Sequence, residues 1–403
     1  MESLENALRL LLDHAASAED TEELSLADAA GRVCAQDILS PIAVPPFDRS
    51  PLDGYAVHSE DLKGASKETP VFLKVIGEAD AGCETVFHPA RGEALRIMTG
   101  APVPAECDCV IRQELTDEGM DMAAFYAEEK HDANICRKGE DVPEGQVMIR
   151  KGERLTPAHL GVITSMGIAS VNVFRRPRVA LVCTGDELLQ PGEAWRFGKI
   201  YDSSRTFLSL RLKELGAQVI AADSVPDDPA LAAEMLLKTA GQVDLIVTTG
   251  GVSVGKKDIM HQVLPLMGAK RLFWKLAMKP GSPTLAAVIC GKLMICLSGN
   301  PFSASACFET LTAPVLEKLS GAADYDLDRS FTAPLANGFG KKSPNRRLIR
   351  ARFNGVNVSV PENQSNGALA SLIGCNCLVD IPAGSGALSE GDPVRVLPMA
   401  GKL

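Results

Sequence analysis

The sequence predicts a multidomain α/β and β fold, in which a doubly wound αβα domain is combined with smaller β-rich domains. With 403 residues the chain is too long for one ordinary domain, since domains average roughly 150 residues. Residues 178–319 alternate apolar strands with helices, which is typical of a parallel sheet covered on both faces. Residues 70–150 and 327–403 instead show short runs of alternating apolar and polar residues, separated by turn residues.

The amino-terminal part predicts two helices, a connector and a β segment. Apolar residues at helical spacing predict a helix over 2–16, and Ser25 predicts the start of a second helix over 25–35. The proline-rich stretch 40–57 cannot continue a helix, because proline lacks the amide donor and fixes φ. A short helix over 156–167 is expected to rejoin the amino-terminal helices, which makes the β segment between them an insertion.

The change of pattern along the chain predicts four domains. Within the αβα region, apolar runs predict strands over 178–185, 217–225, 243–251 and 293–299, and the segments between and after them predict helices over 204–215, 226–240, 256–267 and 302–319. The predicted domains are a small discontinuous helical and β amino-terminal domain (1–40 with 142–176), an inserted mostly-β domain (41–141), the αβα domain (177–326) and a β-barrel-like carboxyl-terminal domain (327–403).

Composition narrows the possible functions. The chain carries 41 Lys and Arg against 51 Asp and Glu, a net charge of −10, which argues against nucleic acid or an anionic membrane surface as the main partner. Its amino terminus has no basic leader, and no apolar run is long enough to span a bilayer. We therefore expect a cytoplasmic protein.

Three glycine-containing turns follow predicted strands, at 184–188, 248–255 and 298–303. In a doubly wound sheet these turns meet at the carboxyl edge, where ligands bind. Glycine lets backbone amides approach a ligand, and a helix start offers free N–H groups to an anion. One such turn is weak evidence, but three at one edge predict a phosphate or other oxyanion site. The candidate substrate-binding residues in these turns are Gly185, Asp186, Gly250, Gly251, Ser253, Gly255, Ser298, Gly299, Asn300 and Pro301.

Carboxylates gather at the same predicted edge, in the set Asp186, Glu187, Asp227, Asp228 and Asp258. Carboxylates beside a phosphate site commonly hold Mg²⁺ that bridges to the phosphate. Asp227 or Asp228 could equally cap the helix that begins at Pro229, and Asp258 could be a first-turn helix acid. Glu187 has no evident capping role, which favours it as a metal ligand.

Basic residues and polar loops supply further candidates. Lys275 and Lys279 lie four residues apart, and either bind a charged substrate or are simply solvated. A basic stripe of the carboxyl-terminal region is either a solvated face or an oxyanion contact; it comprises Lys341, Lys342, Arg346, Arg347, Arg350 and Arg352. Loops of the β segment carry polar residues that serve function or turn chemistry, namely Asp48, Asp53, Thr99, Arg137, Glu140 and Asp141.

Eight ordered strings now identify a resemblance that covers essentially the whole chain. They are FDRSPLDGYAV, RIMTGAPVP, RKGEDV, CTGDEL, IYDSS, TTGGVSVGKKD, FWKLAMKPGSP and SGNPFSA. In this order they resemble the molybdopterin molybdenumtransferases of the MoeA and gephyrin E-domain type. The resemblance implies an enzyme that transfers molybdate into the dithiolene of adenylated molybdopterin, uses Mg²⁺, releases AMP and yields molybdenum cofactor.

The resemblance also implies an elongated homodimer of four-domain subunits and a set of site residues. The site lies between the αβα domain of one subunit and the β segment of the other, and transient contact with other molybdenum-cofactor proteins is expected. By this resemblance Glu187 and Asp258 are the Mg²⁺ ligands. The implied catalytic residues are Asp53, Thr99, Asp141, Asp228, Lys275 and Lys279, and Ser203 in IYDSS and Arg350 join Pro301 and the turn residues in binding substrate.

Three residues depart from the family's pattern. Lys256 stands where an acid is common, Ser282 where PGKP has its lysine, and Ser298 where LPGNP has its first proline. A tungstate-preferring paralogue and a catalytically weakened binding or scaffold protein are therefore alternatives to a molybdenum insertase. The retained carboxylates and lysines favour the enzyme over the scaffold. A single-domain enzyme that adenylates molybdopterin is disfavoured by the additional β domains.

Overall fold

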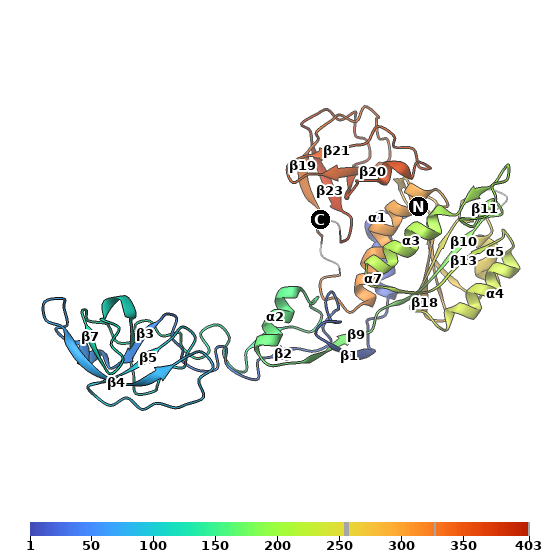
Figure 1. The fold of residues 1–403 in the computed structure, drawn as a ribbon. Helices are drawn as coiled ribbons and strands as arrows, with labels where there is room; N and C mark the ends of the chain where they lie inside the picture. The colour runs from blue at the N-terminus through green and yellow to red at the C-terminus, as the bar shows by residue number, and fades with distance from the viewer. Residues whose placement is uncertain (254–257, 326–327, 402–403) are drawn as a thin grey trace.

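The computed structural model describes residues 1–253, 258–325 and 328–401. Figure 1 shows a β-rich unit at one end of the molecule and a mixed α/β unit at the other, joined by a slender middle region. The carboxyl-terminal β domain lies beside the α/β unit. The structure therefore has the predicted multidomain architecture.

A six-stranded sheet forms the centre of the α/β unit. Its strands, in spatial order, are β13 (Gln218–Val225), β10 (Arg178–Thr184), β14 (Leu245–Thr249), β18 (Lys292–Leu297), β17 (Leu285–Ile289) and β15 (Lys270–Trp274). The first four are parallel, and β17 and β15 pair antiparallel at the edge. The sheet is therefore parallel over the four strands that the apolar runs predict, and it continues into two antiparallel strands, β17 and β15, that were not predicted.

Helices cover both faces of this sheet. They are α3 (Ser203–Glu214), α4 (Pro229–Ala240), α5 (Met260–Leu266), α6 (Pro301–Cys307) and α7 (Ala313–Leu319), with a π-helical turn (Phe308–Thr312) between α6 and α7. Alternate residues of β10 serve the two cores: Val179 and Leu181 pack with α3, α6 and α7, whereas Ala180 and Val182 pack with α4 and α5. The strand β10 is therefore apolar on both sides, which explains its continuous apolar run.

The first helix, α1 (Leu4–His14), packs on the same side as α6 and α7. Its buried residues Leu4, Ala7 and Leu11 recur at helical spacing and belong to the core of the six-stranded sheet. Ser3 caps the helix through its side chain, which accepts a hydrogen bond from the Asn6 amide. A segment remote in sequence is thereby fixed to the α/β unit.

The predicted helix over 25–35 does not form. Instead β1 (Thr21–Ser25) pairs antiparallel with β9 (Ser170–Phe174), and a turn follows in which the Asp28 amide donates to the Ser25 hydroxyl. Gly31 then adopts φ 73°, and its amide donates to the Leu155 carbonyl. Ser25 closes a turn rather than capping a helix, because pairing with the 153–174 region satisfies the backbone of this segment.

The middle region also contains α2 (Pro157–Ser165) and a short pair of strands, β2 (Ile38–Leu39) and β8 (Val147–Ile149). Thr156 and His159 form a reciprocal capping box at the start of α2, and Pro157 occupies its first turn. The helix expected over 156–167 is confirmed. Residues on both sides of the β segment share one hydrophobic cluster, including Ile38, Ile149 and Ile163.

The β-rich unit at the far end contains a five-stranded sheet. Its order is β6 (Cys109–Arg112), β3 (Gly54–Val57), β5 (Glu93–Ile97), β4 (Val71–Ala79) and β7 (Met122–Phe125), with 3₁₀ turns at Ser59–Leu62 and Gln113–Leu115. Tyr55 and Phe125 meet edge to face in its core, with ring centroids 5.4 Å apart. This β-rich unit, called the distal β unit below, presents loops 45–53 and 136–141.

The sheet of the carboxyl-terminal β domain includes one strand, β16, from the α/β segment of the chain. Its sheet runs β16 (Met278–Lys279), β20 (Arg346–Phe353), β22 (Cys377–Ile381), β23 (Pro393–Pro398) and β19 (Phe331–Pro334), with β21 (Val358–Ser359) paired to β20 and a 3₁₀ turn at Ala370–Leu372. Lys279 pairs with Arg347 across the first two of these strands. None of the helices in the described part of the chain is long and apolar enough to cross a membrane.

Candidate active site

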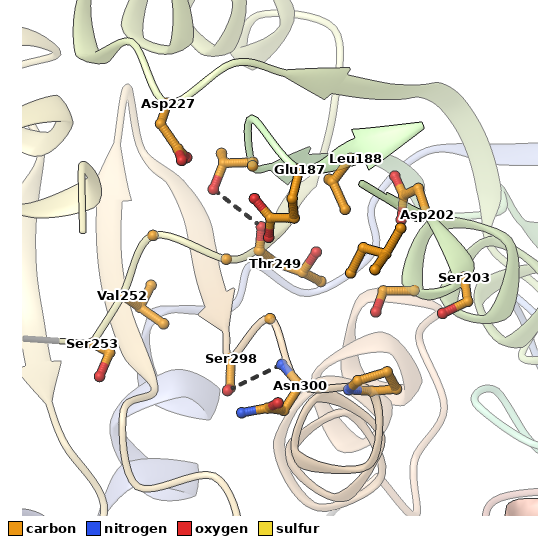
Figure 2. Close-up of a pocket in the computed structure, with 18 of the residues that line it drawn as sticks. Glu187, Leu188, Asp202, Ser203, Asp227, Thr249, Val252, Ser253, Ser298 and Asn300 are labelled. Atoms are coloured by element: carbon orange, nitrogen blue, oxygen red, sulfur yellow. Dashed lines mark hydrogen bonds between the residues drawn. The ribbon is translucent and has the colours of Figure 1, made fainter. Parts of the chain in front are cut away.

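A cavity of about 600 Å³ opens at the carboxyl ends of β10, β14 and β18. Figure 2 shows Glu187, Ser253 and Asn300 around it, each from a different turn. The three glycine turns predicted from the sequence therefore meet at one edge of the sheet. The predicted residues that line the cavity are Gly185, Glu187, Ser203, Gly250, Gly251, Ser253, Asp258, Ser298, Gly299, Asn300 and Pro301.

Close packing of the turns explains the glycines. Gly250 has φ 87°, and a Cβ at this position would lie 2.4 Å from the carbonyl oxygen of Thr184. A Cβ on Gly299 would lie 3.5 Å from the Cα of Gly250. The Gly250 amide also donates to the Leu297 carbonyl, at 3.1 Å. Only a residue without a side chain at position 250 lets the first and second turns approach this closely, whereas a Cβ on Gly299 would make an ordinary van der Waals contact.

The carboxylates at this edge have different surroundings. Glu187 and Asp258 both line the cavity, and Asp258 accepts a hydrogen bond of 2.8 Å from the Ser253 amide. Asp227 also lines it and exchanges backbone-to-side-chain hydrogen bonds with Asp186, at 3.1 and 3.4 Å. Asp186 is outside the lining, but this exchange links the first turn to the loop after β13.

Asp228 caps a helix, which was one of the alternatives open from sequence. Its side chain accepts hydrogen bonds from the amides of Ala230 and Leu231, at 2.8 and 3.1 Å, at the start of α4. The cap satisfies amides that have no partner within the helix. Asp228 does not line the cavity, whereas the preceding residue, Asp227, does.

The carboxylates at the cavity are compatible with a Mg²⁺ ion whose coordination is completed by the substrate and water. Within residues 1–253, 258–325 and 328–401, no group of three or more His, Cys, Asp and Glu side chains is placed to hold a metal ion. Mg²⁺ does not require such a cage, because it is commonly bound by one or two carboxylates together with substrate phosphates and water. Glu187 and Asp258 supply carboxylates of this kind on the wall of a single cavity.

Sequence reasoning missed several residues that line the cavity. Asp202 is 1% exposed and caps α3, accepting from the Arg205 amide at 2.9 Å and the Ser224 hydroxyl at 2.7 Å. An acidic residue directly before a helix was a signal for it. Gly367 comes from the carboxyl-terminal domain, and no local pattern marks it. The carboxylate Asp227, noted from the sequence at this edge, also lines the cavity, and the other lining residues outside the predicted site set are Thr184, Leu188, Ile200, Tyr201, Ser204, Thr249, Val252 and Pro283.

The two lysines lie outside the lining. The Lys275 ammonium is 4.3 Å from the centroid of the Trp274 ring, and Lys279 belongs to β16. Of the departures from the family's pattern, Ser298 lines the cavity, and Ser282 donates to the Leu276 carbonyl at 2.9 Å. Two further residues named from sequence, Gly255 and Lys256, lie outside the described residues.

Arg350 is fully buried and does not line the cavity. Its guanidinium donates to the carbonyls of Ala368, Asn363 and Ser365, at 3.0, 3.1 and 2.6 Å, and stacks 3.9 Å from the centroid of Phe302. Burial lowers the pKa of Arg350. The basic stripe is therefore not one solvated face, because this member is enclosed by backbone carbonyls.

A second set of predicted residues lies in or beside the distal β unit, which is at the opposite end of the molecule from the α/β unit (Figure 1). Asp53 accepts hydrogen bonds from the amide and the hydroxyl of Thr99, both at 2.7 Å. These bonds, the amide first, lower the pKa of Asp53. Asp141 lies in the loop 136–141, and its amide donates to the Val44 carbonyl. Within one chain the structure brings Asp53 and Thr99 together but not with the cavity.

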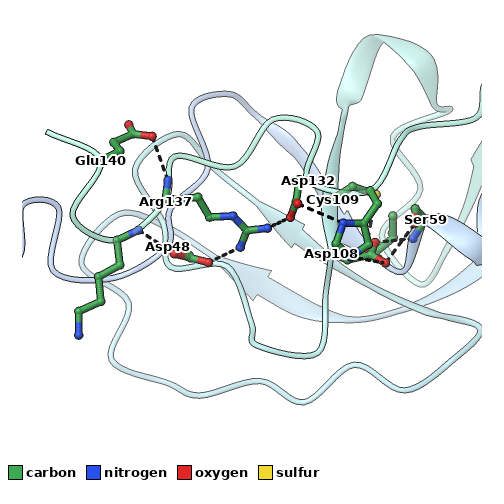
Figure 3. A network of polar contacts seen from close by, with 10 residues as sticks. Asp48, Ser59, Asp108, Cys109, Asp132, Arg137 and Glu140 are labelled. Carbon is green, nitrogen blue, oxygen red and sulfur yellow. Dashed lines mark hydrogen bonds and ion pairs between the residues drawn. The ribbon is translucent and has the colours of Figure 1, made fainter. Parts of the chain in front are cut away.

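Polar contacts hold the two loops of the distal β unit together (Figure 3). The Arg137 guanidinium pairs with Asp48 and Asp132, and Asp48 also accepts from the Lys138 amide at 2.7 Å. Burial alone would raise the pKa of Asp48, but these hydrogen bonds lower it. The Arg137 amide donates to Glu140 at 3.0 Å. The loop that leads to Asp53 is thereby fixed to the loop that carries Asp141.

Comparison with known proteins places this architecture in a family. Residues 2–167 match the model of the MoeA N-terminal region (domain I and II), 180–318 that of a probable molybdopterin binding domain, and 332–399 that of the MoeA C-terminal region (domain IV). A molybdopterin molybdenumtransferase of Haemophilus influenzae is 35% identical over 405 residues, covering 99% of this chain and 98% of the relative. The chain belongs to the MoeA family of molybdopterin molybdenumtransferases.

Other members of the MoeA family are similar to this chain over nearly its full length. A molybdopterin molybdenumtransferase of Staphylococcus epidermidis is 34% identical over 379 residues, covering 93% of this chain and 90% of the relative. A crystal structure of the molybdopterin biosynthesis MoeA protein from Pyrococcus horikoshii OT3 matches with a TM-score of 0.85 and 30% identity, over 99% of this chain and 100% of that one. The three turns of the cavity all lie within the region matched by the molybdopterin-binding model.

Proposed function

We propose that this chain inserts molybdate into the dithiolene of adenylated molybdopterin, with release of AMP, to give molybdenum cofactor. The observation that carries the proposal is the cavity formed by three amide-rich turns in the region matched by the molybdopterin-binding model. Adenylated molybdopterin carries a pyrophosphate, and molybdate is a dianion. Both substrates are therefore oxyanions of the kind that such turns bind.

The chain's own groups bind and orient the substrate in this proposal. The amides of Gly185 and Gly250 are bonded to the carbonyls of Val225 and Leu297, so the other amides of the three turns would donate to the pyrophosphate. The Ser253 and Ser298 hydroxyls would add adjustable donors. Preorganised donors stabilise charge that develops as AMP leaves, because they need no reorganisation during the reaction. The described site therefore has the means to bind and orient both substrates through hydrogen bonds and charge.

Glu187 and Asp258 would hold Mg²⁺ at the cavity wall. When bound, the ion would neutralise phosphate charge and polarise the bond to the leaving AMP. Asp227 and Asp186, which bind each other's backbone, would keep the first turn and its Glu187 in place. The two carboxylates would leave coordination positions for phosphate oxygens and water.

We further propose a homodimer in which the distal β unit of one subunit completes the cavity of the other. In a single chain β3 and β5, next to which Asp53 and Thr99 stand, lie at the opposite end of the molecule from the α/β unit (Figure 1), so in this proposal these two residues reach the cavity from a second copy. A mixture of Asp53→Asn and Glu187→Ala subunits tests this. Equal mixing should restore roughly a quarter of wild-type activity, because half the dimers would contain one intact site. Activity no higher than that of either variant alone would disprove the shared site.

The activity itself is tested with purified protein, adenylated molybdopterin, molybdate and Mg²⁺. We expect stoichiometric AMP release and reconstitution of an apo molybdoenzyme. Substituting tungstate for molybdate distinguishes a tungstate-preferring paralogue, which would turn over faster with tungstate. If neither AMP release nor cofactor transfer occurs with either oxyanion, the binding or scaffold alternative is favoured instead. We also propose that the protein acts in the cytoplasm, in transient contact with other molybdenum-cofactor proteins.

A further inference from the structure

Trp274 contacts the second turn of the cavity from the antiparallel edge of the sheet. It is the last residue of β15, and its indole Nε1 donates a hydrogen bond of 3.1 Å to the Val252 carbonyl. Val252 is buried and lines the cavity after Gly250 and Gly251. A side chain outside the cavity wall thus restrains a turn that lines the cavity.

The same ring contacts Lys275. The Lys275 ammonium lies 4.3 Å from the centroid of the Trp274 ring, and the His261 ring packs edge-on against that indole with centroids 4.3 Å apart. Lys275 has φ 72°, a conformation that residues other than glycine seldom adopt. Its amide donates to the Thr284 carbonyl, and its carbonyl accepts from the Glu2 amide, both at 2.9 Å.

These contacts link Lys275 to the cavity, although Lys275 does not line it. Hydrogen bonds on both sides of its peptide fix where the Lys275 side chain begins, and the indole face determines where its ammonium lies. Tryptophan attracts a cation more strongly than tyrosine or phenylalanine does. Because the indole is also bonded to Val252, any displacement of the second turn would move the surface on which the ammonium rests.

We propose that Trp274 is a positioning residue, which fixes the 250–253 turn through its indole N–H and fixes Lys275 through its ring face. The kinetic consequence rests on the proposed molybdenum insertion, but the two contacts do not. The indole N–H bonds the turn at Val252, whereas the ring face contacts the Lys275 ammonium. The two roles can therefore be separated by substitution.

Fluorescence tests the contact with Lys275 without any reaction. The chain has two tryptophans, so Trp195→Phe leaves Trp274 as the only indole fluorophore. In that background Lys275→Met should shift the Trp274 emission maximum, because it removes a cation from the ring face. Lys279→Met, four residues on, is the matched control and should leave the spectrum unchanged. Identical spectra for Lys275→Met and its parent would overturn the proposal.

Kinetics test the two roles separately. Trp274→Phe keeps a ring but loses the N–H, so KM for adenylated molybdopterin should rise about tenfold with kcat within about twofold, since a buried carbonyl loses its donor. Trp274→Leu loses the ring as well and should lower kcat in addition. Trp195→Phe is the control and should retain wild-type constants.

Two kinetic outcomes would contradict the proposal. A wild-type KM in Trp274→Phe would show that the indole N–H does not position the turn. An equal loss of kcat in both Trp274 variants, accompanied by an equal fall in melting temperature, would reduce the residue to a structural one. Absence of insertase activity in the wild-type protein would refute the proposed function, whereas the fluorescence result would still decide the contact with Lys275.

Discussion

The cavity of the α/β unit and the loops of the distal β unit both hold site residues predicted from the sequence, but contacts of different kinds stabilise the two regions. At the cavity, steric fit dominates: a Cβ on Gly250 would lie 2.4 Å from the Thr184 carbonyl oxygen. In the distal unit, Arg137 and Asp48 join two loops through partly exposed charges. Steric contacts cannot be adjusted by solvent, whereas exposed ion pairs are screened by salt. The two regions should therefore respond differently to substitution.

The largest expected effect is at Gly250. Gly250→Ala should lower turnover about a hundredfold, because the turn must shift by an appreciable distance and misplacement of this size has that cost. Gly216→Ala is the matched control, since Gly216 has φ 83° but open space around the Cβ position. It should lose about 1 kcal/mol of stability to backbone strain and keep its turnover. Steady-state AMP release and thermal unfolding measure both, and equal turnover in the two variants would contradict the steric account.

The second effect tests the metal role assigned to the cavity. Glu187→Ala should raise the Mg²⁺ concentration needed for half-maximal turnover at least about tenfold, because one of two protein ligands is lost. The fold should survive, since Glu187 lies on the cavity wall. Glu193→Ala removes an exposed acid from the neighbouring loop and should leave the Mg²⁺ titration unchanged. An unaltered Mg²⁺ dependence of Glu187→Ala would exclude it as a ligand.

A smaller effect is expected on the pH dependence of the distal unit. The Thr99 amide and hydroxyl lower the pKa of Asp53, so its charge is kept as pH falls below the ordinary titration range of Asp and is lost only at the lowered value. Thr99→Val removes the hydroxyl and leaves the amide. The pKa of Asp53 should rise part of the way back, and the acid limb of the pH–activity profile should move to higher pH. Thr99→Ser should keep the wild-type limb; a limb that moves equally in both would count against the hydroxyl.

The smallest effect concerns the ion pair between the loops. Asp48 and Arg137 have side chains that are 33% and 45% exposed, so Asp48→Asn should cost only about 0.5 kcal/mol of stability. The cost should shrink in high salt, unlike that of Gly250→Ala. Urea unfolding at low and high ionic strength measures the difference. A loss of several kcal/mol, or one insensitive to salt, would show that this loop pair is held sterically after all.

Local chemistry made much of the fold predictable. The capping residue Thr156, Pro157 and the apolar spacing of α1 act over a few residues, so the corresponding helices form where the sequence indicates them. The apolar runs of β10 and β14 likewise need burial on both faces. Three glycine turns at strand ends then had to meet at one edge, because parallel strands share their carboxyl end.

Other features depended on partners far away in the chain. The segment after Ser25 has turn and helix signals alike, and pairing with the 153–174 region decides between them. The antiparallel addition of β17 and β15 beside β18 is likewise decided by strand pairing. Because backbone pairing compensates for weak local preference, a sequence window cannot reveal it.

The sequence by itself determined the α/β pattern, the oxyanion turns and the carboxylates available to them, since each follows from spacing over a few residues. Tertiary structure decided which of those residues line the cavity. Asp227 lines it while Asp228 caps α4, and the carboxyl-terminal domain contributes Gly367 to the lining. It also enclosed Arg350 among backbone carbonyls and set Lys275 against an indole. Such choices depend on how domains and loops pack across long separations, and no local pattern encodes them.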